Sequence, residues 1–323
     1  MAKPKIIVTR RWPAEVEQQL AESFDVRFNA DDKPFDQAAL KRAFSEADAV
    51  FPTVSDRIDA QVLAAEPLRA KLLGNFGVGF NHIDLEAAKA RGIAVTNTPE
   101  VLTDATADLA ITLLLMVARR SGEGERHVRA GAWTGWRPTH MMGTQVTGKT
   151  LGLIGFGRIG RAVAQRAHHG FGMKIVFQDP YPPKPQDVAA LGAEACASVE
   201  EVLARADFVS LHCPGGGENR HLMNAERLTA IQPHALLINT ARGDVIDEAA
   251  LVEALKSGAI AGAGLDVYEG EPKVHPGLLG LENAVLLPHL GSATRETRVA
   301  MGMRVLENAK AFFSGEPPPN RVA

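Results

Sequence analysis

The chain has 323 residues, of which 46% are hydrophobic and 23% are charged, a balance typical of a soluble globular protein. The 35 lysines and arginines nearly cancel the 38 acidic residues, and the resulting net charge of −3 excludes the strongly basic surface of a nucleic-acid-binding or lipid-binding protein. The two cysteines, Cys196 and Cys213, form no CxxC pair, which excludes a disulfide scaffold and gives no reason to expect a metal site.

Two stretches bear on the cellular compartment. Lys3-Pro4 leads directly into the short apolar run Ile6–Val8, so the N-terminal sequence predicts no export signal. The most apolar stretch, Leu109–Ala118, is about half as long as the roughly 20 residues that a membrane-spanning helix needs. We therefore expect a cytoplasmic protein in a reducing compartment, without a membrane partner.

Short apolar runs alternate with amphipathic stretches in the first third of the chain, which is typical of a parallel sheet covered by helices. Helices are expected over Pro13–Ser23 and Asp36–Ala47, because Pro13 and Asp36 suit helix starts. The predicted strands are Lys5–Thr9, Asp25–Phe28, Asp48–Thr53, Lys71–Phe76 and Ile93–Thr96. This order predicts one small doubly wound unit.

A long helical stretch, Thr103–Arg129, follows this unit and is apolar on nearly every face through Leu115. We predict one helix here, buried between domains or in a subunit interface. The next segment, Gly131–Gly148, is rich in Gly, Pro, Trp and Thr, and this composition favours a structured loop.

A second alternating series runs from Thr150 onwards and predicts a six-stranded dinucleotide-binding unit. Its helices are expected over Arg158–His169, Ala225–Ile231 and Glu248–Ser257, and the tail Arg295–Phe313 predicts a further amphipathic helix. The predicted strands are Thr150–Ile154, Lys174–Gln178, Phe208–His212, Ala235–Asn239, Ile260–Gly264 and Ala284–Leu287. The chain is therefore expected to have an α/β fold with two doubly wound parallel-sheet domains.

A glycine turn follows the first strand of this second series. Gly155 permits a tight turn, Gly157 lets the backbone approach a pyrophosphate, and Gly160 allows the next helix to pack closely on the strand. Asp179 comes 19 positions after Gly160, at the end of the next predicted strand. A carboxylate there accepts hydrogen bonds from the adenosine ribose and repels a 2′-phosphate, so the pattern favours NAD over NADP.

Three titratable residues follow predicted strand ends in the same series, where open parallel sheets bind their ligands. His289 can donate a proton near neutral pH, and Glu271 would raise its pKa and orient its ring. Arg242 can bind a carboxylate and a carbonyl oxygen through its planar guanidinium. Each residue alone also fits an ordinary structural role, whereas together they suit the reduction of a 2-keto acid.

The chain resembles the D-isomer-specific 2-hydroxyacid dehydrogenase family over essentially its whole length. The motifs that carry the resemblance are GNFGVGFNHID (Gly74–Asp84), NTPEVLTDATADLA (Asn97–Ala110), GKTLGLIGFGRIG (Gly148–Gly160), LHCP (Leu211–Pro214), INTARG (Ile238–Gly243), GLDVYEGEP (Gly264–Pro272) and LPHLGSAT (Leu287–Thr294). By this resemblance Arg242 binds substrate, Glu271 is the partner of the histidine, and His289 is the acid/base.

The resemblance also implies a domain organisation. Residues 1–102 and 295–323 would form a flavodoxin-like substrate domain, and a Rossmann NAD-binding domain of residues 103–294 would be inserted into it. The substrate carboxylate would be bound by the backbone amides around Val78 and Gly79, together with Arg242 and His289.

Further residues fall where this family contacts NAD. They include Asp266, which suits the nicotinamide amide, and Cys213, which would pack beside the cofactor without acting as a nucleophile. The full set is Thr106, Gly155, Gly157, Arg158, Ile159, Gly160, Asp179, Cys213, Thr240, Arg242, Asp266, His289 and Gly291.

Within the family, Phe51–Asp59, Asn97–Ala110 and the loop around Trp133 and Trp136 look most like the glyoxylate and hydroxypyruvate reductase branch. In that branch an aromatic residue of the loop reaches the active site of a neighbouring subunit, which implies a homodimer; packing alone is the other interpretation of the two tryptophans. The chain departs from the family pattern at Asn81-His82 and at His140–Met142, near the expected substrate end, which puts the accepted side chain in doubt.

The expected reaction is therefore the reduction of a small 2-keto acid to a D-2-hydroxy acid, with hydride from NADH and a proton from His289. Two alternatives stay open: an NAD-sensing protein of the corepressor type, and a dehydrogenase of another D-2-hydroxy acid such as D-lactate. Formate dehydrogenase chemistry is disfavoured, because those relatives carry glutamine where Glu271 stands.

Overall fold

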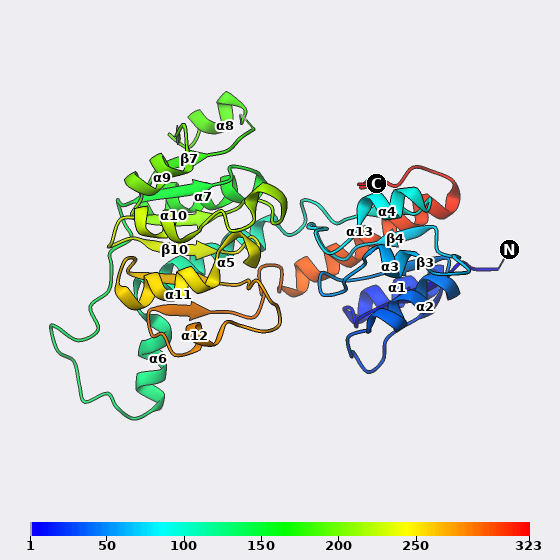
Figure 1. The fold of residues 1–323 in the computed structure, drawn as a ribbon, viewed down its shortest axis with the longest axis horizontal. Helices are drawn as coiled ribbons and strands as arrows, with labels where there is room; N and C mark the ends of the chain where they lie inside the picture. The colour runs from blue at the N-terminus through cyan, green and yellow to red at the C-terminus, as the bar shows by residue number, and fades with distance from the viewer. Residues whose placement is uncertain (1, 182) are drawn as a thin grey trace. The chain divides into compact units, whose positions relative to one another are not determined.

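The computed structural model describes residues 2–181 and 183–323, which form two compact units. The first unit comprises the chain through Leu102 together with Ala293–Ala323, and the second comprises Thr103–Ser292. Each unit is an open parallel sheet covered by helices on both faces (Figure 1), which confirms the predicted α/β fold.

The sheet of the first unit has five parallel strands in the order β2-β1-β3-β4-β5. Its strands are β1 (Lys5–Val8), β2 (Asp25–Arg27), β3 (Ala49–Phe51), β4 (Leu72–Gly74) and β5 (Ala94–Thr96). All five predicted strands are confirmed, each shorter than the apolar run that indicated it. The order reverses at β1, as in a doubly wound fold of the flavodoxin type.

Alternate residues of these strands face opposite helix layers, because successive side chains of a strand point to opposite faces. Ile7 and Val50 pack with one set of helices, whereas Ile6 and Phe51 pack with the other. The first set is α2 (Gln37–Glu46), α3 (Ala60–Leu63) and α4 (Leu85–Ala90), and the second is α1 (Ala14–Ser23) and α13 (Arg295–Ser314). Asp36 caps α2 as predicted, accepting a hydrogen bond from the amide of Ala39.

The sheet of the second unit has seven parallel strands in the order β12-β11-β10-β9-β6-β7-β8. Its strands are β6 (Thr150–Ile154), β7 (Lys174–Gln178), β8 (Glu194–Ala195), β9 (Phe208–Leu211), β10 (Leu236–Asn239), β11 (Gly262–Leu265) and β12 (Ala284–Leu286). The sequence predicted six of these strands, and the prediction was wrong in omitting the seventh, the edge strand β8. This strand has only two residues, both exposed, and so leaves no apolar pattern in the sequence.

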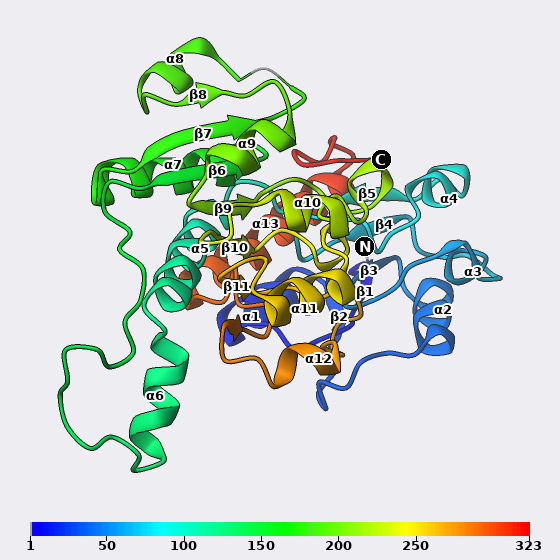
Figure 2. The ribbon, with the colours of Figure 1, turned by 60° about the vertical axis from the view of Figure 1, so that its left-hand side comes forward.

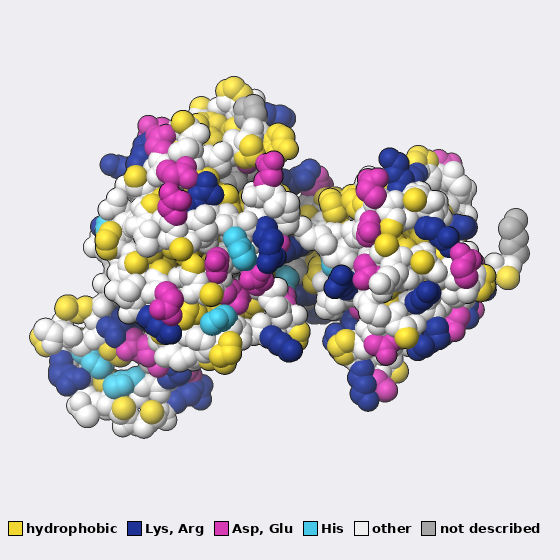
Figure 3. Space-filling view, viewed as in Figure 1, with side chains coloured by type: hydrophobic (Ala, Val, Ile, Leu, Met, Phe, Trp, Pro, Cys, Tyr) yellow, Lys and Arg dark blue, Asp and Glu magenta, His cyan; other side chains and the backbone are white. Residues whose placement is uncertain are grey.

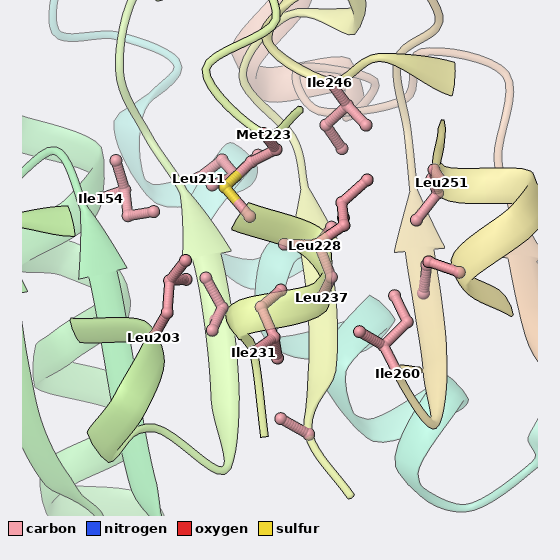
Figure 4. Packing of buried hydrophobic residues seen from close by; sticks show 14 of the residues in the cluster. Ile154, Leu203, Leu211, Met223, Leu228, Ile231, Leu237, Ile246, Leu251 and Ile260 are labelled. Atoms are coloured by element: carbon pink, nitrogen blue, oxygen red, sulfur yellow. The ribbon is translucent and has the colours of Figure 1, made fainter. Parts of the chain in front are cut away.

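One face of this sheet is covered by α9 (Val199–Arg205), α10 (Ala225–Ala230) and α11 (Glu248–Ser257), as Figure 1 shows. Figure 4 shows how side chains from these helices and from the strands pack against one another, with Leu203, Leu228 and Leu251 from the helices and Leu211 and Leu237 from the strands. The other face packs against α7 (Arg158–Phe171) and the preceding helix α5 (Thr103–Ala118). The unit also contains the short helices α8 (Pro185–Ala189) and α12 (Pro276–Leu279) and two 3₁₀ turns.

The single helix predicted over Thr103–Arg129 is in fact two helices. The chain turns at Arg120, whose φ of 51° ends α5, and α6 (Ser121–Arg129) begins in a new direction. The burial of α5 arises within its own unit, since Leu113 lies against the backbone of Gly264 in β11. Packing within its own unit therefore accounts for the buried face of α5, and the expected place of this helix between domains or subunits stays a prediction.

By contrast, α6 has no buried residue, and Figures 1 and 2 show it extending from the rest of its unit together with the loop that follows it. We refer to residues 121–145 as the arm. Across the described residues, no helix has the length and apolar character needed to cross a membrane.

Candidate active site

The glycine turn follows β6, beside the point where the strand order of the second unit reverses between β6 and β9. Gly155 has a φ of +95°, and a Cβ there would lie 2.7 Å from the backbone of His212. A Cβ on Gly160 would lie 2.3 Å from the carbonyl oxygen of Gly155. Both positions therefore need glycine so that strand, turn and helix can pack closely.

Gly157, unlike Gly155 and Gly160, faces open space. It is the exposed N-cap of α7, it carries no side-chain cap, and a Cβ there would meet nothing within 4 Å. Open space in front of backbone amides at a helix N-terminus suits a pyrophosphate, because the amides and the helix dipole both favour an anion. Arg158 and Ile159 form the first helical positions next to this space.

Asp179 follows β7 and is anchored beside the glycine turn. Its Oδ2 accepts a hydrogen bond of 2.6 Å from the amide of Phe156, and its Oδ1 accepts one of 2.8 Å from the amide of Tyr181. The carboxylate is therefore held where the sequence predicts the ribose-binding acid.

Thr240, at the end of β10, fits a further polar ligand. Its side chain is 8% exposed, and within residues 2–181 and 183–323 its hydroxyl oxygen has no hydrogen-bond partner. A buried hydroxyl without a partner is costly, and a bound dinucleotide could supply one. The open space at Gly157 and the unpartnered hydroxyl of Thr240 are compatible with a dinucleotide cofactor in this unit.

Cys213 and its neighbour His212 follow β9 against the glycine turn. Burial raises the pKa of the Cys213 thiol to about 11, so the thiol stays protonated at neutral pH and is no nucleophile. Burial lowers the pKa of His212 to about 4, and its Nε2 lies 2.9 Å from Ser210 Oγ. His212 is thus a neutral side chain beside the turn, and no pattern in the sequence indicated this role.

Asp266, at the end of β11, organises the loop that carries the predicted acid/base. Its carboxylate is 1% exposed and accepts hydrogen bonds from the amides of Leu290 and Gly291, of 2.6 and 2.8 Å. Thr106 donates to the carbonyl of Gly291 over 3.2 Å. The predicted contact of Asp266 with a nicotinamide amide remains a prediction, whereas its hold on this loop is visible.

His289 and Glu271 are brought together, although 18 residues separate them. His289 Nδ1 lies 2.8 Å from Glu271 Oε2, and Glu271 Oε1 accepts a hydrogen bond from the amide of Tyr268. This fixes the imidazole and leaves Nε2 as the nitrogen that a substrate can meet. Burial raises the pKa of Glu271, but the hydrogen bond and charge of His289, the Tyr268 amide and the charge of Arg242 outweigh it, so the pKa is lowered overall.

Arg242 is the third member of the predicted trio. Burial lowers the pKa of its guanidinium, against the opposing charges of Glu271 and Asp244. It donates from Nη1 to the carbonyl of Ala241, and across the described residues it forms no ion pair. A half-buried cation without a direct counter-ion is unfavourable, so this side chain suits an anionic ligand.

The remaining predicted substrate contacts, Val78 and Gly79, belong to the first unit and follow β4. Their amide hydrogens have no hydrogen-bond acceptor within the part of the chain that the structure describes. Such a pair of amides suits a carboxylate.

The arm of the second unit presents apolar side chains on its surface. Trp133, Trp136 and Met142 are 55%, 81% and 68% exposed, and Val128 of α6 is 59% exposed. Figure 3 shows histidine and basic side chains gathered at the lower left of the view. Within the arm, the ring centroids of His127 and His140 lie 5.2 Å apart. The predicted structured loop is therefore largely exposed in the single chain.

Comparison with known proteins places these residues in a family. The model of the NAD-binding domain of D-isomer-specific 2-hydroxyacid dehydrogenases matches residues 111–291. A glyoxylate reductase of Thermococcus litoralis is 45% identical and covers 99% of this chain and 97% of its own length. A glyoxylate reductase of Pyrococcus furiosus is 44% identical, with 99% and 95% covered.

Two solved structures have folds similar to that of this chain. A protein of Thermus thermophilus has a TM-score of 0.90 at 44% identity, covering 99% of this chain and 100% of its own. An NADPH-dependent glyoxylate/hydroxypyruvate reductase of Sinorhizobium meliloti has a TM-score of 0.88 at 36% identity, covering 100% and 97%. The chain therefore belongs to the D-isomer-specific 2-hydroxyacid dehydrogenase family, in its glyoxylate reductase branch.

Proposed function

We propose that the chain reduces small 2-keto acids of the glyoxylate and hydroxypyruvate class to D-2-hydroxy acids, with NADH as the reductant. The observation that carries this proposal is the His289–Glu271 pair, in the same unit as the open glycine turn and as Arg242, which is half-buried and forms no ion pair among the described residues. The curated relatives named above are glyoxylate reductases, which supports the same substrate class here.

Different residues would bind the substrate and transfer the proton. Arg242 would bind the carbonyl oxygen and carboxylate of the substrate, and the amides of Val78 and Gly79 would bind the carboxylate. His289 would hold a proton on Nε2 and transfer it to the carbonyl oxygen, while Glu271 stabilises the charged imidazole at Nδ1. NADH, when bound, supplies the hydride that reduces the carbonyl carbon.

The test is the oxidation of NADH by the purified protein with glyoxylate, hydroxypyruvate and pyruvate, compared by kcat/KM. Glyoxylate or hydroxypyruvate should give the highest value. A clear preference for pyruvate would instead assign the chain to D-lactate chemistry. NADH binding without turnover of any 2-keto acid would contradict the proposal and favour an NAD-sensing protein.

We also propose that NAD(H) is preferred over NADP(H). Asp179, fixed by the amides of Phe156 and Tyr181, would repel a 2′-phosphate and accept hydrogen bonds from the ribose. Asp179→Ala should reduce the ratio of kcat/KM for NADH to that for NADPH by about tenfold or more, the size of a lost hydrogen bond to a charged group. An unchanged ratio in a folded variant would remove Asp179 from this role. Glu253→Ala, on the exposed face of α11, serves as a control.

The arm supports a homodimer as the working form. Its segment of residues 121–145 exposes four large apolar side chains, Val128, Trp133, Trp136 and Met142, and a second copy of the chain is the proposed partner that covers them. The two free cysteines, Cys196 and Cys213, support a cytoplasmic location.

A further inference from the structure

The buried side chain of Asn75 forms hydrogen bonds with the turn Gly77–Gly79 of the first unit. Asn75 follows β4 and is 0% exposed. Its Nδ2 donates two hydrogen bonds of 3.0 Å, one to the carbonyl of Gly77 and one to the carbonyl of Gly79. A single side-chain amide therefore fixes two carbonyls of one turn.

A second asparagine holds the carbonyl between them. Asn97 follows β5 and is 8% exposed, and its Nδ2 donates to the carbonyl of Val78 over 2.9 Å. The amide of Thr98 also donates to the carbonyl of Gly77, over 3.1 Å. All three successive carbonyls of the turn thus point toward the two asparagines.

This fixes where the amide hydrogens point. In a trans peptide the C=O of one residue and the N–H of the next point in opposite directions. Because the carbonyl of Gly77 points toward Asn75, the N–H of Val78 points away from it. Because the carbonyl of Val78 points toward Asn97, the N–H of Gly79 points away from that asparagine. Neither of these two amides has an acceptor within the described part of the chain.

Each asparagine forms further hydrogen bonds, Asn75 through its side chain and Asn97 through its backbone. Asn75 Oδ1 lies 3.0 Å from His82 Nε2, and because Nδ2 is used as the donor, Oδ1 is the acceptor and His82 must carry a hydrogen on Nε2. Asn97 is held through its backbone, which accepts from Asn308 of α13 over 3.3 Å and donates to the carbonyl of Asn320 over 3.1 Å. Asn97 is therefore tied to α13 and to the C-terminal segment, whereas Asn75 is held by His82.

We propose that Asn75 and Asn97 are positioning residues for the 2-keto acid, which aim the amides of Val78 and Gly79 at its carboxylate by holding the opposite carbonyls. This inference rests on the proposed function. It predicts that the asparagines govern substrate affinity and leave NADH affinity unchanged, because they act on a turn of the first unit and the cofactor residues lie in the second.

The test compares Asn75→Asp with Asn29→Asp. Both changes remove a buried or partly buried Nδ2 that donates to two backbone carbonyls of the first unit, but Asn29 holds Thr9 and Lys33, away from the turn. Asn75→Asp should raise the KM for glyoxylate and the Ki of oxalate by about tenfold or more, the size expected for weakened bonds to a charged acceptor. The Kd of NADH, followed by fluorescence, should stay within about twofold, and Asn29→Asp should change neither constant.

Asn97→Ser provides a second variant in case Asn75→Asp does not fold, and the same pattern is expected from it. An unchanged KM in a folded variant, or a parallel loss of substrate affinity, NADH affinity and Tm, would overturn the positioning role. If the wild-type protein turns over no 2-keto acid, the proposed function fails on its own. Calorimetric titration of oxalate into the NADH complex of each variant then still decides whether the asparagines control carboxylate binding.

Discussion

His289 adopts a left-handed backbone conformation with a φ of 56°, which is uncommon for a residue other than glycine. Its amide donates to the carbonyl of Asp266, and its ring is fixed by Glu271, so both backbone and side chain are constrained by the loop after β11. Local strain of this kind persists only where the surrounding contacts enforce it. At this residue they orient Nε2 for the proposed proton transfer.

Replacing this imidazole should separate chemistry from cofactor binding. His289→Gln should lower kcat with glyoxylate by about 10²- to 10⁴-fold, the usual size of a lost general acid. The Kd of NADH should remain nearly unchanged, because the glycine turn and Asp179 are untouched. Stopped-flow measurement of turnover and fluorescence titration of NADH would check both; a large loss of NADH affinity would contradict the acid/base role.

His212 gives a prediction about stability and pH. Burial lowers its pKa from 6.5 to about 4, so the unfolded chain binds this proton more readily than the folded chain. The stabilising contribution of the neutral ring is therefore complete above about pH 6.5 and is lost as the pH falls toward 4. The Tm of the wild-type protein should fall over this range more steeply than that of His212→Asn, as thermal melts at a series of pH values would measure. Parallel curves for the two proteins would show that His212 does not contribute.

At the scale of elements, the strand β6, the glycine turn and α7 form the unit that would receive the cofactor. Gly157 and Gly160 lie in one turn of chain but differ in what surrounds them. Next to Gly157 there is open space, whereas Gly160 is packed against the carbonyl of Gly155. One glycine thus suits ligand approach and the other serves packing.

The two glycines therefore make a matched pair of variants. Gly157→Ala has an allowed φ of −70° and should leave Tm nearly unchanged while weakening NADH binding by about tenfold or more, because a methyl group enters the space for the pyrophosphate. Gly160→Ala should destabilise the protein by about 1–3 kcal/mol, as overpacking does. Fluorescence titration and thermal melts would test the pair. Equal effects of both changes on Tm and on NADH affinity would contradict this division.

The helical segment after the first unit shows why element prediction has limits. Its apolar character correctly indicated a buried helix, and Asp36 correctly indicated the start of α2. The prediction overlooked the break at Arg120, although Ser121-Gly122 and Gly124 follow it and glycine is a poor helix former. The edge strand β8 was missed since its two exposed residues have no apolar pattern.

At the scale of the whole molecule, the chain forms one unit from two separate segments and the other from a continuous segment between them. The arm belongs to the continuous segment and exposes four large apolar side chains, Val128, Trp133, Trp136 and Met142. If these residues are covered by a second copy of the chain, assembly should depend on them.

Sedimentation of the wild-type protein should accordingly give the mass of two copies of the 34.5 kDa chain. The double change Val128→Asp and Trp136→Ser should shift the protein toward a single copy, because it places a charge and removes a large aromatic at the proposed contact. Met303→Ser, an exposed apolar residue of α13, is the control and should leave the mass unchanged. A wild-type monomer at micromolar concentration would contradict the dimer.

The sequence by itself determined the fold class, the two alternating series, the dinucleotide turn with Asp179, and the choice of Arg242, Glu271 and His289 as the proposed catalytic trio. These features are local: a strand alternates, a glycine turn has fixed spacing, and motifs keep their order along the chain. Tertiary structure alone decided that Glu271 contacts His289 across 18 residues, that Arg242 is half-buried without an ion pair within the described residues, and that Asn75 and Asn97 hold the same turn. Such contacts depend on how the ends of separate strands come together in space, and no local pattern of residues predicts how far apart two such ends lie.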